Sequence, residues 1–130
     1  MVDVAVVGAH LSGQPLNHQL TERGGRLVRA ARTSARYHLF ALPNSTPAKP
    51  GLVRASEGHA IELEVWRLPA TQYGSFVALI GSPLGIGNVE LEDGTWVQGF
   101  VCESWALDGA EEISRFGGWR AWLATRKAGA

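Results

Sequence analysis

The clearest alternation of apolar and polar residues runs from Ala60 to Leu68, read as AIELEVWRL. A period of two residues is typical of a strand with one face in the core and the other toward solvent. Glu62 and Glu64 fall on the second face, and we expect them to be solvated. The alternative is that one of them points into a barrel or cleft interior, where a carboxylate would have a chemical role.

Several other segments also have strand-like patterns. Residues 4–7 (VAVV) form a continuous apolar run, short enough for a strand that is buried on both faces. Asp93-Gly94 separates two alternating runs and is a strong hairpin signal. The remaining strands are expected at residues 26–33, 36–42 and 52–54, with the two arms of the hairpin at 88–92 and 95–102.

Helical spacing is restricted to short segments. Pro15 is expected to open a helix in which Leu16 and Leu20 share a face, and Pro69 a second helix that continues to Ile80. The other expectations are a turn and short helix at residues 108–116, a last helix at 119–126, a tight loop at 82–87 and fraying at 127–130.

Together these elements predict an α+β fold in a single domain, residues 1–130. About six or seven short strands dominate, and about two or three short helices are too few for a βαβ alternation. We therefore expect a small, mostly antiparallel β-barrel or curled sheet with short peripheral helices.

Composition narrows the classes of partner. Twelve basic residues balance twelve acidic ones, which gives no electrostatic case for binding nucleic acid or an anionic membrane. No apolar run approaches the roughly 20 residues of a membrane helix, and the first residues lack the pattern of a signal peptide. Cys102 is the only cysteine, so no intrachain disulfide can form. These features predict a cytoplasmic protein.

The turn after the first predicted strand, Gly8–Gly13 (GAHLSG), is the candidate site. A buried strand, a glycine-bounded turn and a helix start place backbone N–H groups around a small concave space that suits an anion or a carbonyl oxygen. His10 is the only side chain in this turn that can carry a proton near neutral pH. The alternative is that His10 is a polar loop residue whose imidazole caps a backbone group.

Other chemistries lack their motifs. A phosphate-binding P-loop, a Gly-x-Ser-x-Gly elbow and Cys-x-x-Cys are absent, and the four histidines have no metal-ligand spacing. No metal and no cofactor are therefore expected. Cys102 lies in a predicted strand, where an inert thiol is the expected state, and Tyr73, in a Tyr-Gly-Ser sequence, is expected to pack within a helix.

Two long motifs resemble the C-terminal domain of allophanate hydrolases: GAHLSG-x-PLN-x-x-L at residues 8–20 and PLGIG-x-V-x-L-x-DG at residues 83–94. The likeness extends over residues 4–123. It implies a gamma-glutamylcyclotransferase-like fold and a role in urea-nitrogen metabolism. In the full-length enzymes an amidase half with a Ser-Ser-Lys triad releases ammonia from allophanate. This chain lacks that half, so it is not expected to be an amidase by itself.

The resemblance implies an enzyme that binds a small carboxylated urea or carbamate and releases carbon dioxide from it. His10 would be the catalytic acid, in an enclosed pocket of about a few hundred cubic ångströms. Arg36 or Arg54 would add positive charge if turned inward. The residues expected to bind the substrate are Gly8, Ala9, Leu11, Ser12, Gly13, Gln14, Asn17 and Tyr37.

Two alternatives stay open. The chain could be a non-catalytic assembly partner of a separate amidase, or form a homodimer, through an exposed apolar patch that includes Trp105, Trp119 or Trp122. It could also be a metabolite sensor that binds a carboxylate without turning it over.

Overall fold

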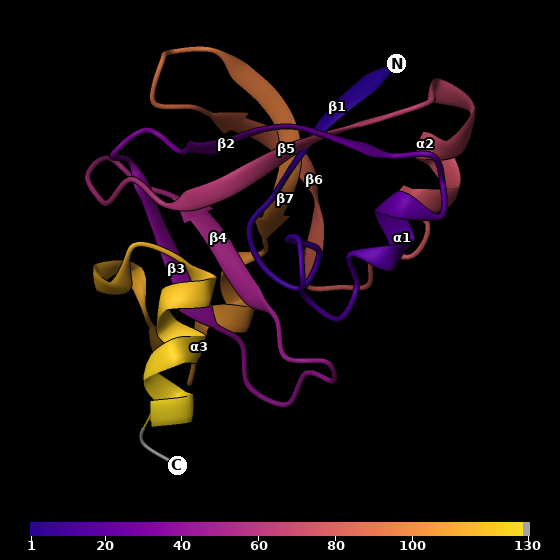
Figure 1. Ribbon diagram of the computed structural model, residues 1–130. Helices are drawn as coiled ribbons and strands as arrows, with labels where there is room; N and C mark the ends of the chain where they lie inside the picture. The colour runs from indigo at the N-terminus through magenta and orange to yellow at the C-terminus, as the bar shows by residue number, and fades with distance from the viewer. Residues whose placement is uncertain (129–130) are drawn as a thin grey trace.

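Strands dominate the molecule and form two sheets (Figure 1), as seen in a computed structural model that describes residues 1–128. The larger sheet has the strand order β2-β5-β1-β7-β6, and the smaller sheet the order β4-β3-β8. The strands are β1 (Val2–Val6), β2 (Arg26–Arg32), β3 (Tyr37–Ala41), β4 (Pro50–Arg54), β5 (Glu62–Leu68), β6 (Leu84–Glu90), β7 (Trp96–Cys102) and β8 (Glu111–Glu112).

The helices are short and lie outside the sheets. In Figure 1, α1 (His18–Thr21) and α2 (Ala70–Val77) lie together on one side of the molecule, while α3 (Trp119–Ala128) lies on the other. Two 3₁₀ turns, Ser104–Leu107 and Ser114–Phe116, complete the elements. No helix among the described residues is long and apolar enough to span a membrane. The fraying expected at residues 127–130 is wrong for residues 127 and 128, whose backbone belongs to α3, and residues 129–130 fall outside what the structure describes.

The central position of β1 explains its continuous apolar sequence. It pairs with β5 in antiparallel and with β7 in parallel orientation, so both of its edges are covered. Val4, Ala5 and Val6 are each at most 1% exposed, which confirms the prediction of a strand buried on both faces. The edge strand β2 is mostly exposed and carries three arginines, a composition that discourages pairing with another chain.

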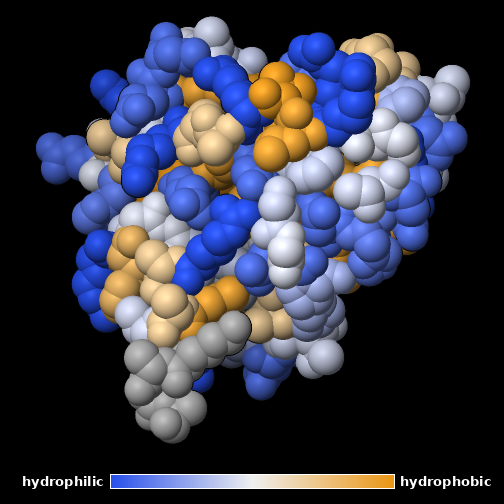
Figure 2. Space-filling model, viewed as in Figure 1, coloured by the Kyte–Doolittle hydropathy of each residue, from blue (hydrophilic) through white to orange (hydrophobic). Residues whose placement is uncertain are grey.

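The predicted fold class is confirmed: the fold is α+β, mostly antiparallel, with short peripheral helices. The strands belong to two hydrogen-bonded sheets rather than to one closed ladder among the described residues. Apolar side chains from both sheets and from α3 form one core. The face drawn in Figure 2 is mainly hydrophilic, with apolar residues in separate small groups.

Three predicted segments differ from the structure. The first helix begins at His18 and not at Pro15, because the Leu16 N–H donates to Ala9 O at 2.8 Å and fixes a turn first. Residues 84–87 are strand and not loop, since β6 pairs with β7 from Leu84 onward. Glu111 and Glu112 extend the small sheet beside β3, where a turn and helix were predicted.

The strand predicted at residues 60–68 is confirmed as β5, but one expectation about it is wrong. Glu62 is partly exposed, whereas the Glu64 residue is only 5% exposed. The reason is that the polar face of β5 at Glu64 is covered by the 8–13 turn and by α3, which both contribute hydrogen bonds to this carboxylate.

We expect Leu63→Ala to lower the free energy of unfolding by about 2–5 kcal/mol, because Leu63 is fully buried and its loss leaves a cavity. Leu27→Ala in β2 is the matched control, since Leu27 is 47% exposed and should change stability by about 0.5 kcal/mol or less. Urea denaturation followed by circular dichroism measures both. Equal losses in the two variants would contradict the core assignment.

Candidate functional site

The turn that follows β1 is packed tightly into the fold. Ala9 and His10 are buried, at 4% and 7% exposure. Gly8 lies so close to the Pro50 ring that a side chain at this position would overlap it. Leu11 N–H donates to Gly8 O at 3.0 Å and closes the turn. The position of His10 is therefore fixed by the backbone around it.

The His10 ring is held by polar and aromatic contacts. Its Nε2 donates to Gln19 Oε1 at 2.7 Å, so the neutral ring carries its lone pair on Nδ1. The ring centroid lies 4.9 Å from that of Phe100 and 5.4 Å from that of Phe76. Asn17 Nδ2 donates to the His10 carbonyl at 2.8 Å and holds the main chain.

The protonation of His10 follows from this environment. Burial lowers the pKa of the imidazole below its ordinary value of 6.5, and the hydrogen bond to Gln19 acts in the opposite direction. The charge of Lys49 lowers the pKa further. In the free protein the ring is therefore mainly neutral at pH 7.

A small pocket opens beside His10. Its solvent-accessible space is about 30 Å³, enough for one or two water-sized groups, and smaller than the sequence led us to expect. Apolar side chains of Leu79, Ile80 and Leu84 narrow it. The pocket is lined by Val6, Val7, Gly8, Ala9, His10, Leu16, Gln19, Lys49, Pro50, Leu79, Ile80, Gly81, Leu84 and Phe100.

The cationic group of this pocket is Lys49, from the segment that precedes β4. The sequence suggested Arg36 or Arg54 for this role, but neither lines the pocket. Arg36 is exposed, and Arg54 pairs with Glu90 at 3.3 Å on the surface.

The anion cradle predicted in the turn exists, but a carboxylate of the chain itself occupies it. Glu64 Oε1 accepts the Ser12 N–H at 2.8 Å and the Ser12 hydroxyl at 3.0 Å. Trp66 Nε1 donates to the same oxygen at 3.0 Å. The N–H groups of Leu11 and Gln14 donate to carbonyls within the turn. Four donors that the sequence assigned to the cradle region are thus already used.

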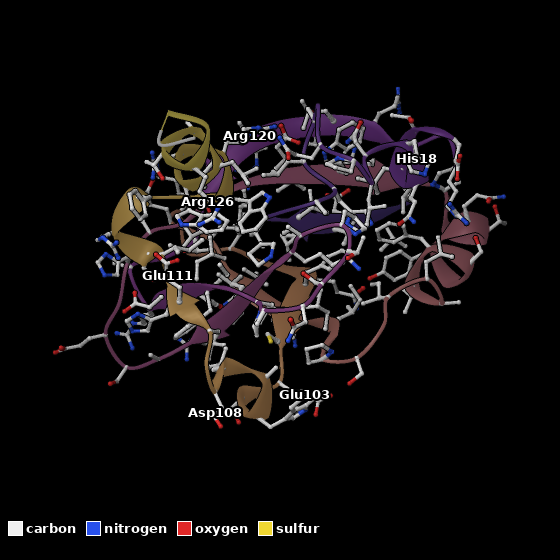
Figure 3. All side chains as sticks on the ribbon, turned by 90° about the horizontal axis from the view of Figure 1, so that it is seen from below. His18, Glu103, Asp108, Glu111, Arg120 and Arg126 are labelled. Atoms are coloured by element: carbon white, nitrogen blue, oxygen red, sulfur yellow. The ribbon has the colours of Figure 1, made fainter. Side chains whose placement is uncertain are left out.

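Arg120 of α3 completes this arrangement. Its guanidinium donates to Glu64 Oε2 at 3.0 Å and to Ser12 O at 2.9 Å, so it joins the helix to both β5 and the turn. Figure 3 shows Arg120 beside α3, on the side of the helix toward the strands. Burial by itself would raise the pKa of Glu64, but the hydrogen bonds from Ser12, Trp66 and Arg120 outweigh it and lower the pKa.

The structure brings only some of the sequence-predicted residues to the pocket. Gly8, Ala9 and His10 line it, while Leu11 is fully buried in the core. Ser12 and Asn17 contact Glu64 and the His10 carbonyl instead of the pocket. Gly13 and Gln14 do not line it either.

Tyr37 is not brought to the pocket. It is fully buried in β3, and its hydroxyl accepts a hydrogen bond from the Glu90 N–H at 2.9 Å. A donor role toward a pocket ligand is incompatible with this position, so we leave Tyr37 out of the site proposed below.

Sequence reasoning missed Gln19, Lys49 and Phe100. Gln19 lies nine residues after His10, and its hydrogen bond to the His10 ring depends on the turn that the Leu16 N–H closes on Ala9 O. The sequence predicted a helix from Pro15 onward in place of this turn. Lys49 ends a proline-rich loop and Phe100 lies in the predicted hairpin, and neither has a local sequence signal for the pocket. Hydrophobic pattern predicts the elements, but not which loop lies over which strand.

The tryptophans, Cys102 and Tyr73 differ in how far they are buried. Trp119 and Trp122 are buried in the core, at 2% and 8% exposure, so they form no exposed patch, whereas Trp105 is 64% exposed. Cys102 lies at the end of β7, where burial raises the pKa of its thiol, in keeping with the expected inert state. The Tyr73 hydroxyl donates to Gln98 Oε1 at 2.7 Å on the surface of α2.

Comparison with known proteins identifies close relatives. A family model described as "Allophanate hydrolase C-terminal domain" matches residues 2–124. Urea amidolyase of Saccharomyces cerevisiae is 44% identical over 127 residues, covering 94% of this chain and 7% of that protein. The structure of Kluyveromyces lactis allophanate hydrolase is 43% identical, with a TM-score of 0.92, and is matched over 95% of this chain and 21% of that one.

A relative of similar length is also known. A uropathogenic E. coli-specific protein is 31% identical with a TM-score of 0.87, and 95% of each chain is covered. An AIG2-like protein of Mus musculus, at 18% identity and a TM-score of 0.60 over 80% of this chain and 77% of that one, shows the fold alone. The chain thus spans a small fraction of its curated yeast relative.

We expect Glu64→Gln to lower the free energy of unfolding at pH 7 by about 1–3 kcal/mol, because an amide replaces the charged acceptor of Ser12 and Arg120. Glu62→Gln is the matched control: Glu62 also contacts Arg120, but its side chain is 38% exposed, so the loss should be about 0–1 kcal/mol.

The pH dependence gives a second readout of the same variants. The pKa of Glu64 is lowered in the folded state, so its stabilisation is complete above 4.5 and is lost as the pH falls through the lowered pKa. The difference between wild type and Glu64→Gln in urea denaturation should shrink from pH 7 to about pH 3. A difference independent of pH would contradict an ionised Glu64.

Proposed function

Because this chain belongs to the allophanate hydrolase C-terminal domain family, we propose that it acts in urea degradation by decarboxylating a small N-carboxylated carbamate at the His10 pocket. The observation that supports this most is the pairing of a buried histidine with a lysine at one small pocket of mixed polarity. The family supports the role in urea degradation, and the residues of the His10 pocket support the chemistry.

The reaction can be written with its atoms balanced. An N-carboxycarbamate dianion takes up one proton and gives carbamate and carbon dioxide. The bond between nitrogen and one carboxylate carbon breaks, its electron pair stays on nitrogen, and the proton is added to that nitrogen. The protein must therefore hold a dianion and deliver a proton to its central atom.

Lys49 supplies the attraction for the dianion. It comes from the segment before β4 and lines the same pocket as His10. A positive charge that lines a narrow, partly apolar pocket attracts an anion more strongly than it would in open water, because the local dielectric is lower. In the free protein the pocket admits only one or two water-sized groups, so the substrate must open the apolar walls of Leu79 and Ile80 to enter. The other carboxylate then lies against these walls and Phe100, where a neutral product, carbon dioxide, is favoured over an anion.

His10 supplies the proton. The free imidazole is mainly neutral because burial lowers its pKa. A bound dianion raises that pKa, since an opposite charge within a few ångströms favours the protonated ring. The protonated ring then gives its proton to the nitrogen as the bond to carbon breaks. Gln19 and Asn17 hold the ring and its main chain at 2.7 and 2.8 Å and act as positioning residues.

We expect wild type to accelerate carbon dioxide release when an amidase produces N-carboxycarbamate from allophanate in the same solution. His10→Ala should lose about 10²–10⁴-fold of this acceleration, the usual contribution of a general acid. His18→Ala is the matched control, because His18 is exposed on α1, outside the lining of the pocket, and its ring bonds to Pro15 O. The measurement is the rate of carbon dioxide evolution divided by the rate of ammonia release.

Equal acceleration by wild type and His10→Ala would contradict the role of His10. No acceleration by wild type would contradict the enzyme proposal itself. That result would favour an assembly role with a separate amidase, for which the exposed Trp105 is the best anchor.

Malonate has a CH₂ in place of the central NH and tests binding without turnover. From about pH 8 to about pH 6.5 its affinity for wild type should rise by up to tenfold per pH unit, since binding takes up a proton on His10. His10→Ala should show no such slope. Lys49→Met should bind more weakly at every pH but keep the slope. Titration calorimetry in buffers of different ionisation enthalpy measures the proton uptake, and a pH-independent affinity in wild type would contradict the mechanism.

A further inference from the structure

Three potential metal ligands meet at the small sheet, away from the His10 pocket. The ligand atoms of His38, His59 and Glu112 all lie within 4.8 Å of one another. His38 Nδ1 lies 3.5 Å from Glu112 Oε2. Ligands about 2.0 Å from one tetrahedral ion lie about 3.3 Å apart, so this pair already has the spacing of a shared ion.

The backbone that carries these side chains is fixed by β3. The His59 N–H donates to Tyr37 O at 2.8 Å, and the Tyr37 N–H to His59 O at 3.3 Å. Gly58 makes this approach possible, because a side chain there would overlap the Tyr37 backbone. Further along the same edge of β3, opposite β4, Glu112 is paired with Phe40. In a strand, residues two apart share a face, so Glu112 and His38 are diagonal neighbours.

The tautomer of His38 leaves its inner nitrogen as an acceptor. Nε2 donates to Glu57 O at 2.9 Å, so the lone pair of the neutral ring is on Nδ1. Nδ1 is buried and makes no hydrogen bond with the described residues. Histidines that ligate metals commonly donate their other ring N–H to a backbone carbonyl in this way.

Glu112 supplies the negative charge. Its carboxylate oxygen Oε2 lies 3.5 Å from His38 Nδ1 and faces the lone pair of that nitrogen. Two acceptors at this separation repel each other unless a proton or a metal ion lies between them.

We propose that His38, His59 and Glu112 bind one divalent transition-metal ion, for which Zn²⁺ is the best match. Two imidazole nitrogens and one carboxylate oxygen suit zinc, whereas calcium and magnesium prefer oxygen ligands alone. The His59 side chain is exposed, and a small movement of its ring would complete the set.

Three protein ligands leave at least one position of a tetrahedral ion open to water or to a ligand from solution. The site is also remote from the proposed catalytic pocket. Figure 3 places Glu111, the neighbour of Glu112 in β8, on the opposite side of the molecule from His18 of α1. Sequence spacing excluded a metal site because the three ligands are distant in the chain and meet only through β3.

The test is Zn²⁺ binding by the untagged protein, followed by titration calorimetry and by metal analysis after dialysis. We expect about one ion per chain in wild type. His59→Ala and Glu112→Gln should each weaken binding by at least about tenfold, the lower limit for loss of even an outer-shell partner. Co²⁺ in place of Zn²⁺ gives a visible spectrum that reports the coordination geometry.

Matched controls separate this site from nonspecific binding. His18→Ala removes an exposed histidine elsewhere, and Glu111→Gln removes the adjacent exposed carboxylate of β8. Both should bind Zn²⁺ as wild type does. No binding by wild type, or equal loss in control and cluster variants, would overturn the proposal. Because the readout is metal binding alone, the result is independent of the decarboxylase proposal.

Discussion

The buried carboxylate of Glu64 is the constraint on which the arrangement of the site depends. One oxygen accepts hydrogen bonds from Ser12 and Trp66, and the other accepts from Arg120. A single ionised side chain of β5 thus joins the turn after β1 to the last helix. Removing a charged group from water is costly, so the structure tolerates Glu64 only because four donor contacts replace its hydration. The contacts to Ser12 hold the second half of the turn that carries His10.

The hydrophobic pattern of the sequence predicted the strands well, but it did not predict which strand faces are covered by other parts of the chain. Alternation in residues 62–68 gave β5 correctly, because a period of two depends only on backbone geometry. It could not show that the polar face would be covered at Glu64, since the covering residues, Ser12 and Arg120, lie 52 and 56 positions away. The solvated glutamate is the common case, and this strand departs from it.

The site was predicted to a similar extent. A strand, a glycine turn and a histidine marked the location, and His10 does lie on a pocket with Gly8 and Ala9. The other pocket residues could not be predicted from the sequence. Lys49 and Phe100 reach the pocket through the way in which the chain before β4 and the strand β7 pack beside the end of β1. Tyr37 was chosen for its chemistry, but β3 belongs to the other sheet, where its hydroxyl accepts from Glu90.

A buried histidine with a lowered pKa looks poorly suited to donate protons at pH 7, yet for a dianionic ligand the environment is appropriate. An imidazole that is already protonated in the free protein would attract other anions from solution into the pocket. It would also require a negative charge in the core to compensate its own. A neutral ring becomes basic only when the ligand brings negative charge close to it. In the proposed reaction, burial and the charge of Lys49, which lower the pKa of His10 in the free protein, would thereby couple proton uptake to binding of the group that uses the proton.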